Sequence, residues 1–150
     1  MAKFRYRMQN ILNMKEKIEE QEKNNYSQSI LQLQLEEEKY QDMVWRQEDA
    51  QKELKTCMLQ TMDVMTIREK EDAVEIIKMY KVQQSFVVLE KQQDVMKARE
   101  QLNEAMKERK IYEKLREKAM DEFLLEEALK ERKEVDELVS YRYGMKKSEE

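Results

Sequence analysis

Proline is absent from this chain, and the only glycine, Gly144, lies close to the C-terminal end. These two residues interrupt regular structure most strongly, so nothing before Gly144 obliges a helix to stop. Glu, Lys, Gln, Met, Leu and Arg, whose side chains lose little rotamer freedom in a helix, dominate instead. With 41% charged residues, the composition is typical of a coiled coil rather than of a globular core.

Histidine is also absent, and Cys57 is the only cysteine. A single cysteine excludes an internal disulfide and fits a reducing compartment. Without histidine, the usual zinc ligand sets and the thiol–imidazole pair are missing as well. We therefore expect no metal and no cofactor, and we expect Cys57 to be a small, partly buried helix residue.

Acidic side chains are abundant, but they do not predict an enzyme. Catalytic carboxylates need a cleft that removes one of them from water and shifts its pKa, and two packed helices offer none. Runs such as Glu36–Glu38 and Glu126–Glu127 are interpreted as solvated faces. No glycine-rich loop is present to hold a phosphate, so nucleotide binding is not expected either.

Long hydrophobic runs are missing. The mean hydropathy of −1.01 would suit a disordered chain, but the net charge is only −4 and the 40% of apolar residues recur at regular spacing. No apolar run approaches the roughly 18 residues of a membrane span. Lys3, Arg5 and Arg7 at the start are not followed by the apolar core of a signal peptide. We expect a cytosolic protein without direct membrane insertion, which reaches a membrane only through a partner.

Apolar residues recur at alternating intervals of four and three, which is the period of a coiled-coil seam. The first frame consists of Phe4, Met8, Ile11, Lys15 and Ile18. After a polar interruption from Glu19 to Asn25, it resumes one residue later with Tyr26, Ile30, Leu33, Glu37, Tyr40, Val44, Gln47, Gln51, Leu54, Met58, Thr61 and Met65. A second seam consists of Val88, Lys91, Val95, Ala98, Leu102, Ala105, Arg109, Tyr112, Arg116, Ala119 and Phe123.

A turn between the two seams is predicted at about residues 61–67. Thr66 and Glu69 match a capping box, in which Thr66 would be the N-cap of the second helix. β-branched residues and an aspartate just before it favour a helix less. Gly144 is expected to end the second helix.

These features predict one all-α domain over residues 1–150, folded as an antiparallel two-helix coiled-coil hairpin. The expected helices cover about residues 3–61 and 67–143, with a frayed tail at 144–150. Periodicity alone leaves an extended parallel dimer open, but we expect a monomer when the protein is isolated.

The pairing register follows from the position of the turn. Pairing about residue 64 brings Ile18 close to residues 110–112 and Phe4 close to residue 124. Everything after about Leu125 then has no partner within the chain, so the second helix is predicted to overhang.

Three further features are interpreted as seam or surface. The methionines near the turn, Met58, Met62, Met65 and Met79, either fill the seam or form an adaptable binding surface, and seam filling is the preferred interpretation. Trp45 and Tyr143 are expected outside the seam. The basic cluster at 107–118 is interleaved with acids, which favours a solvated face or contact with an acidic protein over nucleic-acid binding.

The sequence resembles the FliJ family. The opening from Phe4 to Leu12, followed by Lys15–Glu20, is similar to the start of FliJ proteins, and the runs Lys107–Leu115 and Glu131–Leu138 are similar to their second half. The resemblance covers almost the whole chain. It implies a hairpin resembling the central stalk subunit of rotary ATPases, acting in bacterial flagellum biogenesis as a non-catalytic part of the type III protein export apparatus.

The resemblance also implies partners. The chain would link the ring of the export ATPase FliI to the export gate protein FlhA, promote assembly or activity of the ATPase, and escort export chaperones. It would lie at the cytoplasmic side of the inner membrane. By the same resemblance, the gate-binding candidates are Tyr40, Val44, Ala73, Ile77, Tyr80 and Gln84. The ATPase-binding candidates are Phe4, Arg5, Arg7, Met8, Val135, Leu138 and Arg142. The alternatives are the stalk of a virulence type III secretion system, or a self-associating structural coiled coil or adaptor.

Overall fold

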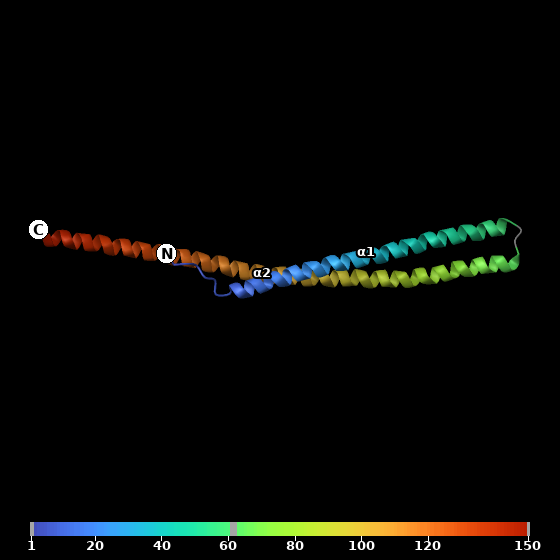
Figure 1. Cartoon of the computed structure of the whole chain (residues 1–150), viewed down its shortest axis with the longest axis horizontal. Helices are drawn as coiled ribbons and strands as arrows, with labels where there is room; N and C mark the ends of the chain where they lie inside the picture. The colour runs from blue at the N-terminus through green and yellow to red at the C-terminus, as the bar shows by residue number, and fades with distance from the viewer. Residues whose placement is uncertain (1, 61–62, 150) are drawn as a thin grey trace. The chain divides into compact units, whose positions relative to one another are not determined.

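The computed structural model describes residues 2–60 and 63–149. These residues form two helices, α1 (Gln9–Leu59) and α2 (Val64–Glu149), and the described ranges contain no strand (Figure 1). Because no proline removes a backbone donor from either helix, their hydrogen-bond ladders run without a break. The prediction of an all-α chain is confirmed.

The chain divides into two units, and each contains a part of α1 and a part of α2. We call residues 2–19 and 105–149 the terminal unit, and residues 20–60 and 63–104 the turn unit. Each is described by itself below.

Within the terminal unit the two parts of the chain run antiparallel. The ring of Phe4 lies 5.5 Å from that of Phe123, centroid to centroid. Further along, the ammonium of Lys15 donates a hydrogen bond of 2.7 Å to the carboxylate of Glu108. Residue numbers therefore increase along residues 2–19 as they decrease along the paired part of α2. The predicted proximity of Phe4 to residue 124 is confirmed.

The turn unit has the same antiparallel arrangement. Lys70 donates a hydrogen bond of 3.1 Å to Glu53, and Gln84 hydrogen-bonds Glu36. The buried side chains include Cys57, Val74 and Ala98. Helices that pair in this way bury stripes that neither could bury alone, and the prediction of an antiparallel hairpin is confirmed.

The helix boundaries differ from the expected ones. Residues 2–8 are not helical, and α1 begins at Gln9 rather than at residue 3. At the other end, α2 passes through Gly144 and continues to Glu149, so the prediction that Gly144 ends the helix is wrong. Nothing lies within 4 Å of the position that a Cβ would take at Gly144. A glycine inside a helix costs about 1 kcal/mol relative to alanine, and that cost alone does not end a helix.

The start of α2 also corrects the prediction. The amides of Thr66 and Ile67 donate to the carbonyl of Asp63, at 3.1 and 3.2 Å, so Asp63 rather than Thr66 caps the helix. Aspartate is among the residues that N-cap positions prefer. Residues 64–67 are therefore helical, whereas residues 61–62 of the expected turn lie outside the described residues.

The seam of α1 runs in one continuous frame, and the predicted shift of phase at Glu19–Asn25 is wrong. Alternating steps of three and four connect its buried and half-buried positions: Leu12, Lys15, Glu19, Glu22, Tyr26, Ser29, Leu33, Glu36, Tyr40, Met43, Gln47, Ala50, Leu54 and Cys57. Several expected seam positions are exposed instead, namely Met8, Ile11, Glu37, Gln51, Met58 and Met65, and Thr61 lies outside the described residues. Polar residues occupy seam positions where the sequence pattern suggested an interruption.

The seam of α2 follows the prediction closely. All the expected positions from Val88 to Phe123 are buried or half-buried, with the exception of the exposed Arg116. The same spacing continues toward the turn through Gln84, Lys81 and Val74. The alanines Ala98 and Ala105 are among the buried residues, which fits the expectation that they let a partner backbone approach.

Candidate protein-interaction surfaces

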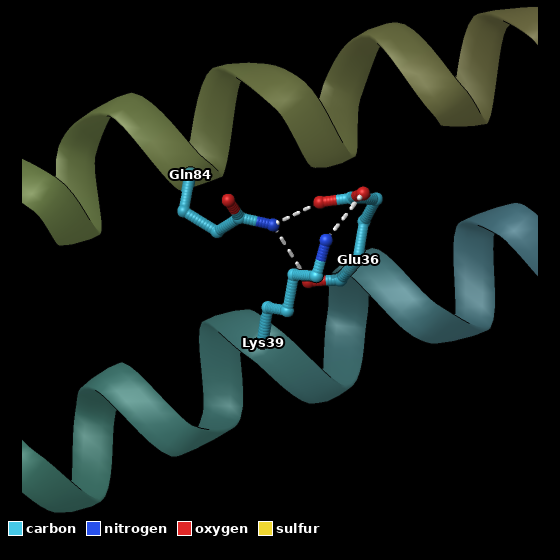
Figure 2. A network of polar contacts seen from close by, with 3 residues as sticks. All are labelled: Glu36, Lys39 and Gln84. Carbon is cyan, nitrogen blue, oxygen red and sulfur yellow. Dashed lines mark hydrogen bonds and ion pairs between the residues drawn. The ribbon is translucent and has the colours of Figure 1, made fainter.

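A polar layer crosses the seam of the turn unit (Figure 2). Gln84 is only 9% exposed, and its amide Nε2 donates to the backbone carbonyl of Glu36 at 3.0 Å and to the Glu36 carboxylate at 2.5 Å. Lys39 forms an ion pair with the same carboxylate at 3.2 Å. The hydrogen bond from Gln84, followed by that from Lys39, lowers the pKa of Glu36 below its ordinary value. The side chain of Gln84 thus faces α1.

The other gate-binding candidates differ in exposure. Tyr40, Val44 and Ile77 are half-buried along the seam, and the ammonium of Lys81 lies 6.0 Å from the centre of the Tyr40 ring. Ala73 and Tyr80 are exposed. Contact with the gate requires accessible atoms, so these two are the members of the predicted set that a partner can reach most easily.

A second apolar stripe runs along α2 on the side away from its seam. It consists of Met79, Val82, Phe86, Leu89 and Met96, whose exposed fractions lie between 53% and 66%. The steps of three and four are again those of a coiled-coil seam, with Gln93 at the one polar position. Phe86 follows the buried Gln84 by two residues, which turns it by about 200° around the helix axis. We call these five residues the outward stripe.

Sequence reasoning missed the outward stripe because it followed a single frame. The signal was present, since a second set of apolar residues recurs at the same intervals two residues out of step with the first. The methionines near the turn do not fill the seam, because Met58, Met65 and Met79 are all exposed, and Met79 belongs to the outward stripe. Seam filling was the wrong interpretation for these three, and Met62 lies outside the described residues. Trp45 and Tyr143 are exposed, as expected.

The N-terminal segment of the terminal unit packs along α2 without forming a helix. Phe4 and Tyr6 are half-buried, and the hydroxyl of Tyr6 donates to the carbonyl of Tyr112 at 3.1 Å. Lys3, Arg5 and Arg7, which alternate with these two aromatics, are exposed. Alternation with a period of two is typical of extended chain. Among the ATPase-binding candidates, Arg5, Arg7 and Met8 are therefore accessible, whereas Phe4 packs on Phe123.

A charged layer crosses the seam of the terminal unit. Arg109 forms ion pairs with the buried Glu19 and, at 2.7 Å, with Glu113. The hydrogen bond to Glu113 is the largest cause that raises the pKa of Arg109. Arg109 belongs to the basic cluster at 107–118, so one of its six cations is engaged in the seam. The exposed lysines of that cluster remain on the surface: Lys107, Lys110, Lys114 and Lys118.

The C-terminal part of α2 has no partner along its apolar face. From residue 124 to residue 149 every side chain is exposed, apart from that of Glu127, which is half-buried. Val135, Leu138 and Arg142, three of the ATPase-binding candidates, lie in this segment, and Leu138 is 63% exposed. We call residues 124–149 the overhang, and its predicted start after about Leu125 is confirmed.

Four apolar side chains of the overhang lie on one side of the helix. Leu124, Ala128, Val135 and Leu138 follow one another at steps of four, seven and three, which places them on a single face. On the opposite face lie Glu126, Lys130, Lys133 and Glu137. The overhang therefore has an exposed apolar stripe, while the exposed Leu125 and Leu129 lie off this stripe.

In the residues that the structure describes, no group of three or more His, Cys, Asp or Glu side chains is arranged to hold a metal ion. Neither described helix is long and apolar enough to cross a membrane. The most exposed apolar surfaces of the described residues are the outward stripe and the stripe of the overhang.

Comparison with known families identifies the chain. The family model of the flagellar FliJ protein matches residues 4–148, which is nearly the full length. The chain belongs to the FliJ family. It is a flagellar protein export component, and the resemblance seen in the sequence is confirmed. No curated protein and no solved structure matched the chain.

Proposed function

We propose that this FliJ-family chain links the export ATPase FliI to the export gate protein FlhA, promotes assembly and activity of the ATPase, and escorts export chaperones. It would do so at the cytoplasmic side of the inner membrane, held there by its partners. The proposal rests on the overhang, the C-terminal part of α2, whose apolar side chains are exposed.

The overhang needs a partner for a physical reason. Most of the stability of a helix in a protein comes from packing its apolar face, and the overhang packs that face against nothing in its unit. A contiguous exposed apolar face of this kind marks an interaction surface. Arg5 and Arg7, which are basic and exposed, belong to the terminal unit, as the overhang does. Both ends of the chain can therefore contact the ATPase.

The mechanism follows from symmetry. A single helix inside a ring of identical subunits cannot present the same side chains to all of them. The subunits that meet the apolar face of the overhang bind it more tightly than the others, which biases their conformations unequally. Such a bias promotes ring assembly or cooperative hydrolysis, although the chain itself hydrolyses no ATP.

For the gate we propose the outward stripe, together with the neighbouring Tyr80. Its side chains are exposed and already held on a helix that is packed against α1, so binding costs little ordering. Ala73 and Tyr80, from the set that the family resemblance suggested, are accessible in the same unit. Large, flexible methionine side chains at Met79 and Met96 also suit an adaptable surface.

The experiment compares the full chain with a chain lacking residues 126–150. We expect the full chain to co-purify with FliI and to raise its ATP turnover, and we expect the shortened chain to do neither while its turn unit keeps its helix signal. Equal stimulation by both chains, or none by the full chain, would contradict the ATPase role.

A matched substitution separates the two surfaces. Phe86→Ser with Leu89→Ser should weaken binding to FlhA by about tenfold or more, because two apolar contacts are lost, and should leave FliI stimulation unchanged. Val135→Ser with Leu138→Ser should have the reverse effect. Light scattering on the isolated protein should give a monomer near 18.4 kDa, whereas a concentration-dependent dimer would favour a self-associating coiled coil.

A further inference from the structure

The half-buried charges of the turn unit are divided by sign between its two helices. Within residues 20–60, the charged side chains of α1 that are not exposed are two acids, Glu22 and Glu36. Within residues 63–104, the corresponding side chains of α2 are four lysines and one aspartate: Lys70, Lys78, Lys81, Lys91 and Asp94. The α1 side of this seam is therefore acidic, and the α2 side is mainly basic. We call Glu22 and Glu36 the seam acids, and Lys81 and Lys91 the seam lysines.

Groups of the two helices stabilise one another across this seam. The hydrogen bond from Gln84 is the largest cause that lowers the pKa of Glu36, and the positive charge of Lys91 acts in the same direction (Figure 2). The ammonium of Lys81 lies 6.0 Å from the centre of the Tyr40 ring, whose face attracts cations. Each helix thus supplies partners for the polar groups that the other places in the seam.

The terminal unit also joins unlike charges across its seam. Lys15 of α1 pairs with Glu108 of α2 at 2.7 Å, and the buried Glu19 of α1 pairs with Arg109 of α2. In this unit, as in the other, a charged seam residue of α1 meets the opposite charge on α2.

Pairing each helix with its own copy in a second chain would remove this match. In a parallel coiled coil in register, a seam residue faces the same residue of the other chain. Glu36 would then face Glu36, and Lys91 would face Lys91. An antiparallel pair of α1 helices fares no better, because the half-buried charges of its seam over residues 20–60 are acids alone. Like charges repel more strongly in a partly dry seam than on an open surface, because the effective dielectric constant there is lower.

Only an α2 helix therefore satisfies the seam of α1. The α2 helix of the same chain is the nearest one, since α1 ends at Leu59 and α2 begins at Val64. A short connection gives the two helices a high effective concentration for one another, which favours pairing within the chain over pairing between chains.

We propose that the opposite signs of the seam acids and the seam lysines direct α1 to the α2 helix of its own chain and prevent the parallel dimer that the seam spacing alone allows. The consequence concerns the overhang. In a parallel dimer the two overhangs would lie next to one another, whereas the hairpin leaves the overhang of each chain available to a different protein. The seam charges thus determine which helix α1 accepts.

The test uses two double variants of the full chain and their combination. Glu22→Lys with Glu36→Lys makes the α1 side of the seam basic, and Lys81→Glu with Lys91→Glu makes residues 81–94 of the α2 side acidic. Each double variant should lower the midpoint of urea denaturation by about 0.5 M or more, because like charges then meet across the seam. The combined variant carries all four substitutions, which restores unlike charges with their signs exchanged, and should recover most of this shift.

The combined variant also separates effects between helices from effects within a helix. Glu36→Lys removes the ion pair with Lys39, and Lys91→Glu removes the ion pair with Asp94, in the double and in the combined variants alike. A combined variant that is more stable than either double variant therefore reports on charge between the helices. As a control, Glu20→Lys with Glu38→Lys makes the same change of charge at exposed positions of α1, and should shift the midpoint by less than about 0.2 M.

Mixing the two double variants tests the choice of partner. Parallel pairing of one with the other places unlike charges opposite each other along both helices. Light scattering on a one-to-one mixture should therefore show a heterodimer of twice the 18.4 kDa of a single chain. The unaltered chain and the combined variant should stay monomeric at the same concentration.

Several outcomes would overturn the inference. A mixture that stays monomeric would do so, and so would double variants that are as stable as the control or a combined variant that is less stable than both. If the double variants are unfolded when alone, a helix signal that returns in the mixture and in the combined variant supports the inference, and a signal that returns in neither overturns it.

Discussion

The outward stripe and the overhang are both exposed apolar faces of α2, but their helices are supported differently. Beneath the outward stripe, α2 buries or half-buries Val74, Gln84 and Val88 along the seam of the turn unit. Beneath the apolar face of the overhang, the opposite side of the helix meets only solvent. The outward stripe is thus a preformed surface, whereas the helical order of the overhang depends only on the backbone hydrogen bonds within α2.

This difference has consequences for binding. A preformed surface loses little conformational entropy when a partner arrives, so less of the free energy of binding is spent on ordering it. A single amphipathic helix frays, and a partner must bear the cost of ordering it. In return, such a helix can enter a confined space and adjust to it. The outward stripe suits a lasting attachment, and the overhang suits a partner that changes shape.

The largest effect expected from this comparison is in hydrogen exchange. Amides of the overhang, for example at Leu138, should exchange at least about 100-fold faster than amides at Val95 in the turn unit, because local opening there disrupts no packing. Mass spectrometry after timed labelling measures both regions in one experiment. Equal protection would remove the distinction between the two surfaces.

A smaller effect is expected in stability. Leu12 is 3% exposed and Leu138 is 63% exposed, so the same substitution probes a supported and an unsupported position. Leu12→Ala should lower the free energy of unfolding by about 2–3 kcal/mol, the range for a buried leucine in a shallow core. Leu138→Ala should change it by less than about 0.5 kcal/mol. Urea denaturation followed by circular dichroism provides both values, and a large loss at Leu138 would show that the overhang is packed after all.

The smallest effect concerns pH and the polar layer of the turn unit. Hydrogen bonds from Gln84 and Lys39 lower the pKa of Glu36, so the ionised form stabilises the folded state. This contribution is fully present above the unfolded pKa of about 4.3 and disappears as the pH falls through the lower folded value. Glu36→Gln should therefore lower the melting temperature at pH 7, and the gap to the unaltered protein should narrow as the pH falls below the unfolded pKa and through the lower folded value. A gap that persists unchanged at lower pH would contradict this role for the carboxylate.

Much of the fold could be predicted because it depends on periodicity and counting. Once two seams and a turn are located, antiparallel pairing fixes which residues meet, and the contact between Phe4 and Phe123 follows. The start of the overhang follows from the same count, because α1 is shorter than α2. The family was also accessible to sequence reasoning, since its features occur in the right order along the chain.

The remainder depends on pairs that a single pattern does not reveal. Glu19 is buried because Arg109 forms an ion pair with it across the seam, and a search for apolar residues treats it as an interruption. Gln84 resembles a surface residue until Glu36 is placed opposite it. Asp63 was counted against a helix, although its carbonyl marks the start of one. The contacts with FliI and FlhA stay predictions, because they depend on partner surfaces.

The N-terminal segment determines how much of α2 a partner can reach. Phe4 and Tyr6 cover α2 between Tyr112 and Phe123, a length of about 16 Å at 1.5 Å per residue. A chain that began a few residues later would leave this length of helix uncovered, without any change in α2 itself. The N-terminal segment thus determines the length of α2 that a partner can contact, although α2 itself provides the contact surface.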